Sequence, residues 1–144
     1  MGQEVTSVTS TGNIFNAIQS IYGKKYNDVD QAMTYLTFDS GAAGDVETMR
    51  IAPYAYDIRG EVIGTEGSIQ IGSMRYHDVN ILTSKGSTHN LIPDFPTRFK
   101  DAYLLEMINF IDCLREGKKP ICTEVDGKVA LEIAAAATKI ICIG

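Results

Sequence analysis

Cysteine and histidine are scarce in this 144-residue sequence, and tryptophan is missing altogether. The three cysteines, Cys113, Cys122 and Cys142, form no Cys-x-x-Cys pair, so neither a disulfide framework nor a zinc site is expected. All three lie in apolar stretches and are expected to be core residues in a reducing, cytoplasmic setting. His77 and His89 are not at metal-ligand spacing from a cysteine or from each other, so ordinary structural roles are expected for both.

Basic runs and long apolar runs are also absent. The chain has 13 Lys and Arg against 18 Asp and Glu, with a net charge of −5. This balance argues against a nucleic-acid partner, because binding to the phosphate backbone needs clustered positive charge. No stretch approaches the roughly 18 consecutive apolar residues of a membrane span, and the first residues do not resemble a signal peptide. A soluble protein is therefore expected.

Three motifs that bind nucleotides or supply a nucleophile are missing. There is no Gly-x-Gly-x-x-Gly and no Gly-x-x-x-x-Gly-Lys-Ser/Thr, so no loop is built to hold a pyrophosphate at a helix N-terminus. There is also no Gly-x-Ser-x-Gly elbow of a serine hydrolase. We expect that this chain alone binds no dinucleotide, and no catalytic residue is assigned.

Strand-forming patterns occupy the first two-thirds of the chain. β-branched residues alternate with polar ones, and glycine-containing turns separate the runs. The stretch from Gly12 to Asp28 is mixed and is expected to be a long excursion. The predicted strands are residues 4–10, a hairpin of 32–38 and 44–51 around Asp39-Ser40-Gly41, a second hairpin of 59–63 and 68–71, and a strand over 76–83.

The apolar period changes to that of a helix after Pro96. A stripe of apolar residues continues to Gly117, which is expected to end the first helix. Thr123 with Asp126 predicts the capped start of a second helix, which continues to Ile140. Strands first and helices last indicate an α+β fold, with an open, mostly antiparallel β-sheet and helices on one face. The other face needs a partner or must be polar.

One ten-residue segment, residues 50–59, concentrates polar and aromatic side chains. It contains Arg50, Tyr54, Tyr56, Asp57 and Arg59. Phenol hydroxyls and charged groups at a strand end suit a polyhydroxylated ligand. The alternative is that the charged residues form solvated ion pairs while the tyrosines pack on the sheet, which composition alone favours.

This segment also carries a resemblance to a known family. Arg50-x-Ala52-x-Tyr54-Ala55-Tyr56-Asp57-Ile58-Arg59, followed by Glu61-Val62-Ile63-Gly64-Thr65-Glu66-Gly67, resembles the C-terminal domain of the glucose-fructose oxidoreductase / inositol dehydrogenase / MocA family, and inositol 2-dehydrogenases in particular. The resemblance extends through the aromatic-Arg-aromatic start of the first helix to residue 137. Inositol dehydrogenases usually have Gly at Ala55, Gln at Ile58 and often Tyr at Phe99, so the substrate need not be myo-inositol.

The resemblance implies a division of labour between domains. Residues 1–144 would form a substrate-binding and oligomerisation domain, and the N-terminal dinucleotide-binding (Rossmann) domain would not be present. In such enzymes the catalytic lysine lies in that domain, and an Asp-x-x-x-His pair lies just upstream of this sequence. NAD or NADP would serve the full-length enzyme and none would bind here, so the isolated chain is expected to be inactive. Expected partners are a polyol or sugar, the missing domain, and further copies bound through the sheet as a dimer or tetramer.

Tyr56 is the first candidate for lining the substrate cleft, because a phenol both donates to and accepts from a hydroxyl. Asp57 beside Arg59 would instead fix the strand. The alternative is a non-catalytic, self-associating β-sheet binding module, while no triad or metal cluster supports a stand-alone hydrolase or metal enzyme. The candidate site residues that the resemblance implies are Tyr56, Tyr54, Arg50, Asp57, Arg59, Phe99 and Tyr103.

Overall fold

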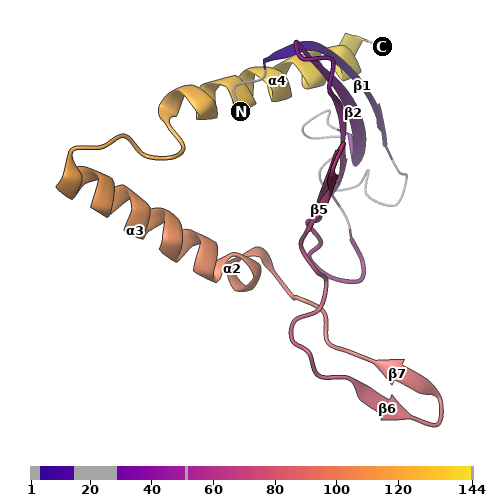
Figure 1. Cartoon of the computed structure of the whole chain (residues 1–144). Helices are drawn as coiled ribbons and strands as arrows, with labels where there is room; N and C mark the ends of the chain where they lie inside the picture. Colours follow the sequence, from indigo (N-terminus) through magenta and orange to yellow (C-terminus); the bar gives the residue numbers. More distant parts are fainter. Residues whose placement is uncertain (1–3, 15–28, 51, 144) are drawn as a thin grey trace. The chain divides into compact units, whose positions relative to one another are not determined.

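The computed structural model describes residues 4–14, 29–50 and 52–143, in two compact units (Figure 1). Unit 1 comprises residues 1–51 and 121–144, and unit 2 comprises residues 52–120. Most of the long excursion predicted between Gly12 and Asp28 lies outside the described residues. Each unit has antiparallel strands and at least one helix, which confirms the predicted α+β class.

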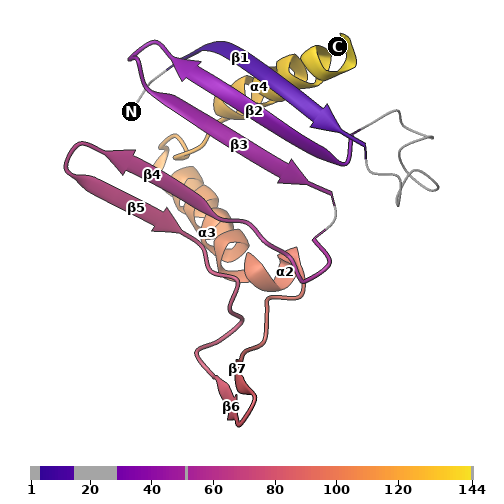
Figure 2. The same cartoon turned by 90° about the vertical axis from the view of Figure 1, so that its right-hand side faces the viewer.

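Unit 1 contains a three-stranded antiparallel sheet in the order β1-β2-β3 (Figure 2). The strands are β1 (Val5–Asn13), β2 (Gln31–Phe38) and β3 (Ala43–Met49). Gly41 turns the chain between β2 and β3 with a φ of 83°, and its N–H donates to the Phe38 carbonyl at 3.0 Å. A positive φ favours glycine, so the predicted first hairpin is confirmed together with its turn.

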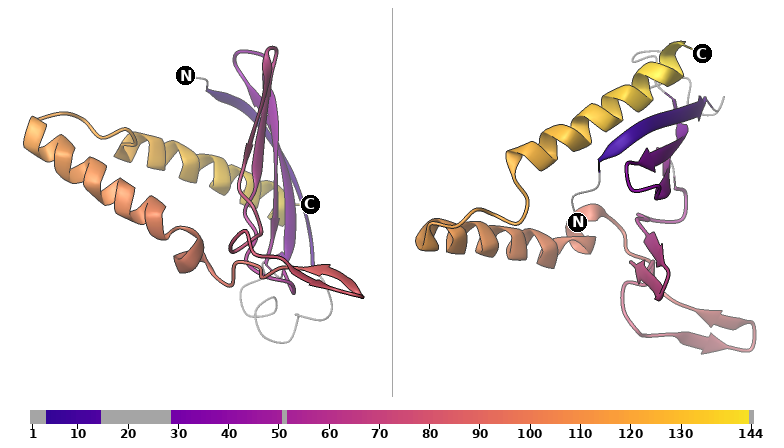
Figure 3. Two further views of the ribbon diagram at one scale, coloured as in Figure 1. Left: turned by 60° about the horizontal axis from the view of Figure 1, so that its bottom comes forward. Right: turned by 45° about the horizontal axis from the view of Figure 1, so that its top comes forward.

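The two faces of this sheet differ in what covers them. Helix α4 (Glu124–Ile143) runs along one face and beside β1 (Figure 3). Leu36 and Thr34 of β2 lie on that face, where the Thr34 hydroxyl is 2.9 Å from the Ser10 hydroxyl. Since side chains alternate along a strand, Met33 and Tyr35 lie on the opposite face, and about half of each side chain is exposed. Among the described residues of unit 1, no helix covers this outer face as α4 covers the inner one.

The start of α4 follows the predicted capping pattern. The backbone N–H and the hydroxyl of Thr123 both donate to Asp126 Oδ2, each at 2.7 Å. These hydrogen bonds lower the pKa of Asp126. Asp126 thus supplies an acceptor for the N–H of Thr123, which has none within the helix. The second predicted helix is confirmed.

Unit 2 begins with the second predicted hairpin, formed by β4 (Gly60–Gly64) and β5 (Gly67–Ile71). The prediction of a strand over residues 76–83 is wrong for most of that range. Only β6 (Ile81–Thr83) is a strand, and it pairs with the unpredicted β7 (Gly86–Thr88). His77 Nδ1 accepts the N–H of Val79 at 3.2 Å, so a local turn replaces the strand there.

The first predicted helix forms as two. Helix α2 (Phe95–Arg98) begins just before Pro96, and α3 (Lys100–Glu116) follows after a break at Phe99. Asp94 caps α2 by accepting the N–H of Thr97 at 2.8 Å. Proline in a first turn loses no intrahelical bond, because its missing N–H would be unpaired there. The helix therefore starts earlier than predicted.

Few apolar side chains are buried. Ile92, Cys113 and Ala137 form the buried hydrophobic set among the described residues. Cys122 and Cys142 are exposed, so the expectation that all three cysteines are core residues is wrong for these two. Cys142 lies in the last turn of α4 and Cys122 in the bend before it, where the described chain offers little to cover them. All three thiols are free.

Candidate functional site

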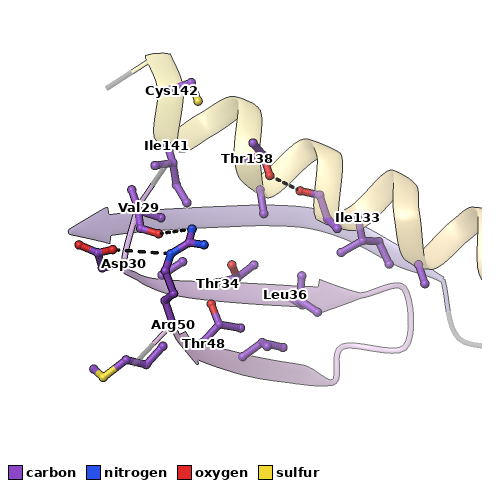
Figure 4. A pocket seen from close by; sticks show the side chains of 16 residues that line it. Val29, Asp30, Thr34, Leu36, Thr48, Arg50, Ile133, Thr138, Ile141 and Cys142 are labelled. Atoms are coloured by element: carbon purple, nitrogen blue, oxygen red, sulfur yellow. Dashed lines mark hydrogen bonds and ion pairs between the residues drawn. The ribbon is translucent and has the colours of Figure 1, made fainter. Parts of the chain in front are cut away.

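Arg50 belongs to unit 1, where it binds the end of the sheet (Figure 4). Its Nη2 donates to the Val29 carbonyl at 3.2 Å, and its Nε lies 3.6 Å from Oδ1 of the buried Asp30. The Arg50 N–H also donates to the Asp30 carbonyl at 2.8 Å. These contacts join β3 to the chain entering β2. Arg50 is thus held by its own unit, while the other candidate site residues belong to unit 2.

A cavity of about 500 Å³ lies between the sheet of unit 1 and α4 (Figure 4). Its wall is largely apolar, with Leu36 on the sheet side and Ile133 on the helix side, and the Asp30–Arg50 pair lies at one end. A site for a polyol needs several convergent polar groups, and this lining has few. Among the described residues, no group of three or more His, Cys, Asp or Glu side chains is placed to hold a metal ion.

In unit 2, Asp57 is the centre of a hydrogen-bonded cluster. Arg59 donates from Nε to Asp57 Oδ1 at 2.9 Å and from Nη2 to Oδ2 at 2.8 Å, and the Tyr54 hydroxyl donates to Oδ2 at 3.2 Å. Arg59's hydrogen bonds hold the pKa of Asp57 below its usual value, and Asp57 in turn raises the pKa of Arg59. A bidentate arginine–carboxylate pair fixes the relative orientation of the two side chains in addition to pairing their charges. Asp57 therefore braces this segment of chain.

Tyr56 lies in the same segment, with its ring held between aromatic residues. Its ring centroid is 6.1 Å from that of Phe95 and 6.3 Å from that of Phe99, the latter edge-to-face at 89°. Phe99 in turn contacts Tyr103 at 6.4 Å. The Tyr56 N–H donates to the Ile92 carbonyl at 3.2 Å. Within the described part of the chain the Tyr56 hydroxyl makes no hydrogen bond, so it can donate to and accept from a ligand.

Of the seven candidate residues, the structure joins Tyr56, Phe99 and Tyr103 in one aromatic cluster, and Tyr54, Asp57 and Arg59 in one polar cluster. Two residues of this region were not among the sequence candidates. Phe95 had a visible signal, because it lies four residues before Phe99 and eight before Tyr103, on one helical stripe. Arg98 had a weaker one, as an arginine between two aromatic residues.

The arrangement suits binding of a small hydroxylated molecule. The Tyr54 hydroxyl donates a hydrogen bond to Asp57, so only its oxygen remains available, as an acceptor, while the Tyr56 hydroxyl can both donate and accept. The rings of Phe95 and Phe99 fix the Tyr56 phenol without using its hydroxyl. A rigid phenol beside a charged brace is a typical device for orienting a polar ligand.

Comparison with known proteins identifies the class of domain. Residues 1–141 match the family described as "Oxidoreductase family, C-terminal alpha/beta domain". The chain therefore belongs to the glucose-fructose oxidoreductase / inositol dehydrogenase / MocA family, as its C-terminal domain.

The similar sequences include inositol dehydrogenases. The chain is 54% identical over 138 residues to scyllo-inositol 2-dehydrogenase (NAD(+)) of Bacillus subtilis, covering 96% of this chain and 40% of that protein. It is 36% identical over 140 residues to myo-inositol 2-dehydrogenase of Thermotoga maritima, covering 96% of this chain and 41% of that protein. The chain thus spans about two-fifths of the length of these relatives.

Solved structures show the same fold. A putative myo-inositol dehydrogenase from Sinorhizobium meliloti superposes with a TM-score of 0.88 at 31% identity, over 98% of this chain and 42% of that one. A probable dehydrogenase from Thermotoga maritima gives 0.86 at 35% identity, over 98% of this chain and 42% of that one. No helix among the described residues is long and apolar enough to cross a membrane.

Proposed function

We propose that this chain is the C-terminal, substrate-binding domain of an NAD(P)-dependent oxidoreductase that oxidises a CH–OH group of an inositol-like polyol or sugar. The supporting similarity is to B. subtilis scyllo-inositol 2-dehydrogenase (NAD(+)) at 54% identity. The observation that carries the proposal is the Tyr56 phenol, fixed by Phe95 and Phe99 and with its hydroxyl unused by any described residue.

A fixed phenol suits a cyclitol ring for a physical reason. Each ring hydroxyl is both a donor and an acceptor, and a phenol can meet either need by rotating only its O–H bond. Ordering the ring before the ligand arrives lowers the entropy lost on binding. Tyr54 would offer an acceptor nearby, and Asp57 with Arg59 would hold both tyrosines in place.

The remaining chemistry belongs, in this proposal, to a dinucleotide-binding domain elsewhere in a longer protein. The chain spans about two-fifths of its relatives, and the motifs that hold a pyrophosphate are missing from its sequence. That domain would bring the nicotinamide, with NAD favoured by the name of the B. subtilis relative, and the base that takes the hydroxyl proton. The isolated chain would then be inactive.

The outer face of the β1-β2-β3 sheet would serve self-association. Met33 and Tyr35 lie on it with 46% and 51% of their surface exposed. Aromatic residues and methionine are enriched at the centre of subunit interfaces, and the rim of such interfaces is polar. A dimer or tetramer formed through this face would cover it.

The test is the Tyr56→Phe substitution in the full-length protein. Because it removes one neutral hydrogen bond to the polyol, we expect KM for the polyol to rise by roughly three- to tenfold, with KM for NAD unchanged. The matched control is Tyr76→Phe, which removes a phenol hydroxyl from an exposed tyrosine of the same unit. Equal polyol KM values for the wild type and Tyr56→Phe would remove Tyr56 from the site.

A further inference from the structure

Arg98, the last residue of α2, connects the helix to two distant backbone segments. Its Nη1 donates to the Ser73 carbonyl at 2.5 Å, and its Nη2 donates to the Ile58 carbonyl. Ile58 precedes β4 and Ser73 follows β5, so Arg98 binds the chain on both sides of this hairpin. A planar guanidinium holds two acceptors in a fixed geometry, which an ammonium does not.

The backbone opposite Arg98 is shaped for this close approach. Gly72 has a φ of 93°, and a Cβ built on it would lie 2.5 Å from Arg98 Nη2 and 2.7 Å from the Ile58 oxygen. Real Cβ atoms do not come this close to backbone oxygens. Any side chain at position 72 would therefore displace the guanidinium from Ile58, and its φ would also be strained.

The contacts of Arg98 and of its neighbours Phe95 and Phe99 together restrict the position of Tyr56. Ile58 lies two residues after Tyr56, so Arg98 fixes the backbone of that segment at its far end. Phe95 and Phe99, which flank Arg98 on the same helical stretch, contact the Tyr56 ring. Arg98 also lies over the Phe99 ring, with its Cζ 5.7 Å from the centroid. The Arg98 side chain thus contacts both the backbone of the segment that contains Tyr56 and the Phe99 ring that packs on the Tyr56 ring.

We propose that Arg98 is a positioning residue, which sets the Tyr56 phenol for the substrate by binding the carbonyls of Ile58 and Ser73. The proposal rests on the proposed function, in which Tyr56 binds the polyol. Arg98 itself does not touch the substrate in this account, because its guanidinium donates to two backbone oxygens and lies half-buried.

A kinetic double-mutant cycle in the full-length protein separates positioning from general support. Arg98→Met and Gly72→Ala are each expected to raise the polyol KM by roughly three- to tenfold while KM for NAD stays constant. Combined with Tyr56→Phe, Arg98→Met should add less than about a twofold further rise, because both changes act through one hydroxyl. Arg98→Lys should give an intermediate KM. A rise that multiplies in the double variant would overturn the proposal.

A spectroscopic readout makes the test independent of activity. With 3-fluorotyrosine incorporated, the resonance missing from Tyr56→Phe identifies Tyr56 in the ¹⁹F spectrum. Arg98→Met and Gly72→Ala should shift or broaden this resonance, and Arg98→Lys serves if Arg98→Met fails to fold. Arg75→Met, at an exposed arginine of the same unit, is the matched control and should leave it unchanged.

The two readouts also separate the two proposals. If Tyr56→Phe leaves the polyol KM unchanged, the proposed site fails, and the ¹⁹F spectrum alone decides whether Arg98 positions the ring. If Tyr56→Phe raises the KM but the Tyr56 resonance is the same in wild type, Arg98→Met and Gly72→Ala, the site stands and the role of Arg98 is refuted.

Discussion

Tyr54, Tyr56, Asp57 and Arg59 lie within six residues and do different things. Asp57 accepts three hydrogen bonds, from Arg59 and Tyr54, so its oxygens are largely occupied. Tyr56 makes ring contacts only, apart from its backbone, and keeps its hydroxyl available within the described chain. The charged residues of this segment therefore hold its conformation, while the Tyr56 hydroxyl is the group that, in the proposed function, binds the substrate.

This division predicts a pH-dependent stability at Asp57. Because Arg59 lowers the pKa of Asp57 in the folded state, the pair stabilises the fold fully above the unfolded pKa of about 3.9. The stabilisation is lost as pH falls through the lowered folded value. Asp57→Asn should therefore have a lower urea midpoint than wild type at about pH 6, and the gap should narrow toward about pH 3.

The matched control is Asp78→Asn, which removes an exposed carboxylate of the same unit that makes no hydrogen bond within the described chain. Its midpoint should follow that of the wild type at both pH values. A gap between wild type and Asp57→Asn that stays constant over this range would contradict the ion-pair account.

The sequence pointed to the polar candidates within residues 54–59 more readily than to the residues that contact them. Residue types and the family resemblance singled out Tyr56 and Asp57, because their chemistry is local. The hydrogen bond between Arg98 and Ile58 joins residues 40 apart, and no period or motif reports such a contact. The role of Arg98 was missed for that reason, whereas Phe95 could have been found from its helical spacing to Phe99, and the pairing of Asp57 with its near neighbour Arg59 was expected.

Among the elements, α3 shows how a single residue ends a helix. Gly117 adopts a left-handed conformation with a φ of 65°, and the N–H of Lys118 donates to the Cys113 carbonyl at 2.9 Å. The Cys113 thiol lies 3.4 Å from the Lys119 carbonyl, so the chain folds back over the last turn. A Cβ on Gly117 would meet nothing within 4 Å, so its φ alone favours glycine.

Gly117→Ala should therefore lower the free energy of unfolding by about 1 kcal/mol, because a left-handed conformation is costly for alanine. Urea denaturation measures the change. Gly117→Asn is the matched variant, since asparagine visits this region more readily, and it should lose less. Equal losses in the two variants would show that something other than φ selects glycine here.

The elements that the sequence predicted well are those with one dominant local signal. Gly41 and Gly117 mark a turn and a helix end through their φ values, and Thr123 with Asp126 marks a helix start. The prediction of one strand over residues 76–83 was wrong because the β-branched residues there suit a strand. Instead, His77 Nδ1 accepts the Val79 N–H and the chain turns. The alternation of side-chain types along the sequence does not reveal such a competing side-chain hydrogen bond.

For the whole molecule, the main observation is how much apolar surface remains exposed. A chain of this length ordinarily buries about two-thirds of its unfolded surface, yet the buried hydrophobic residues among those described are three. The apolar stripe predicted on α3 is exposed, including Leu114 at 65%. This surface supports the proposal that the chain works with other domains and other copies.

Self-association through the outer sheet face predicts the effect of Met33→Lys. The new charge would face Glu47 across the strand pair, so the fold should be retained. Burying the same charge in an interface is costly, and light scattering should show a lower molar mass than for wild type. Leu131→Lys, on an exposed position of α4, should leave the mass unchanged. An unchanged mass for Met33→Lys would place the interface elsewhere.

The arrangement of unit 1 along the chain has a consequence for synthesis. Its strands β1, β2 and β3 come before all of unit 2, and α4 comes after it. A ribosome therefore completes the sheet long before it supplies the helix that covers it. Until then the side chains of Val8, Leu36 and Val46, which face α4 in the folded unit, are uncovered on the nascent chain. Apolar surface exposed in this way is prone to aggregation. Within these 144 residues, unit 1 is therefore completed after unit 2, although its strands precede unit 2.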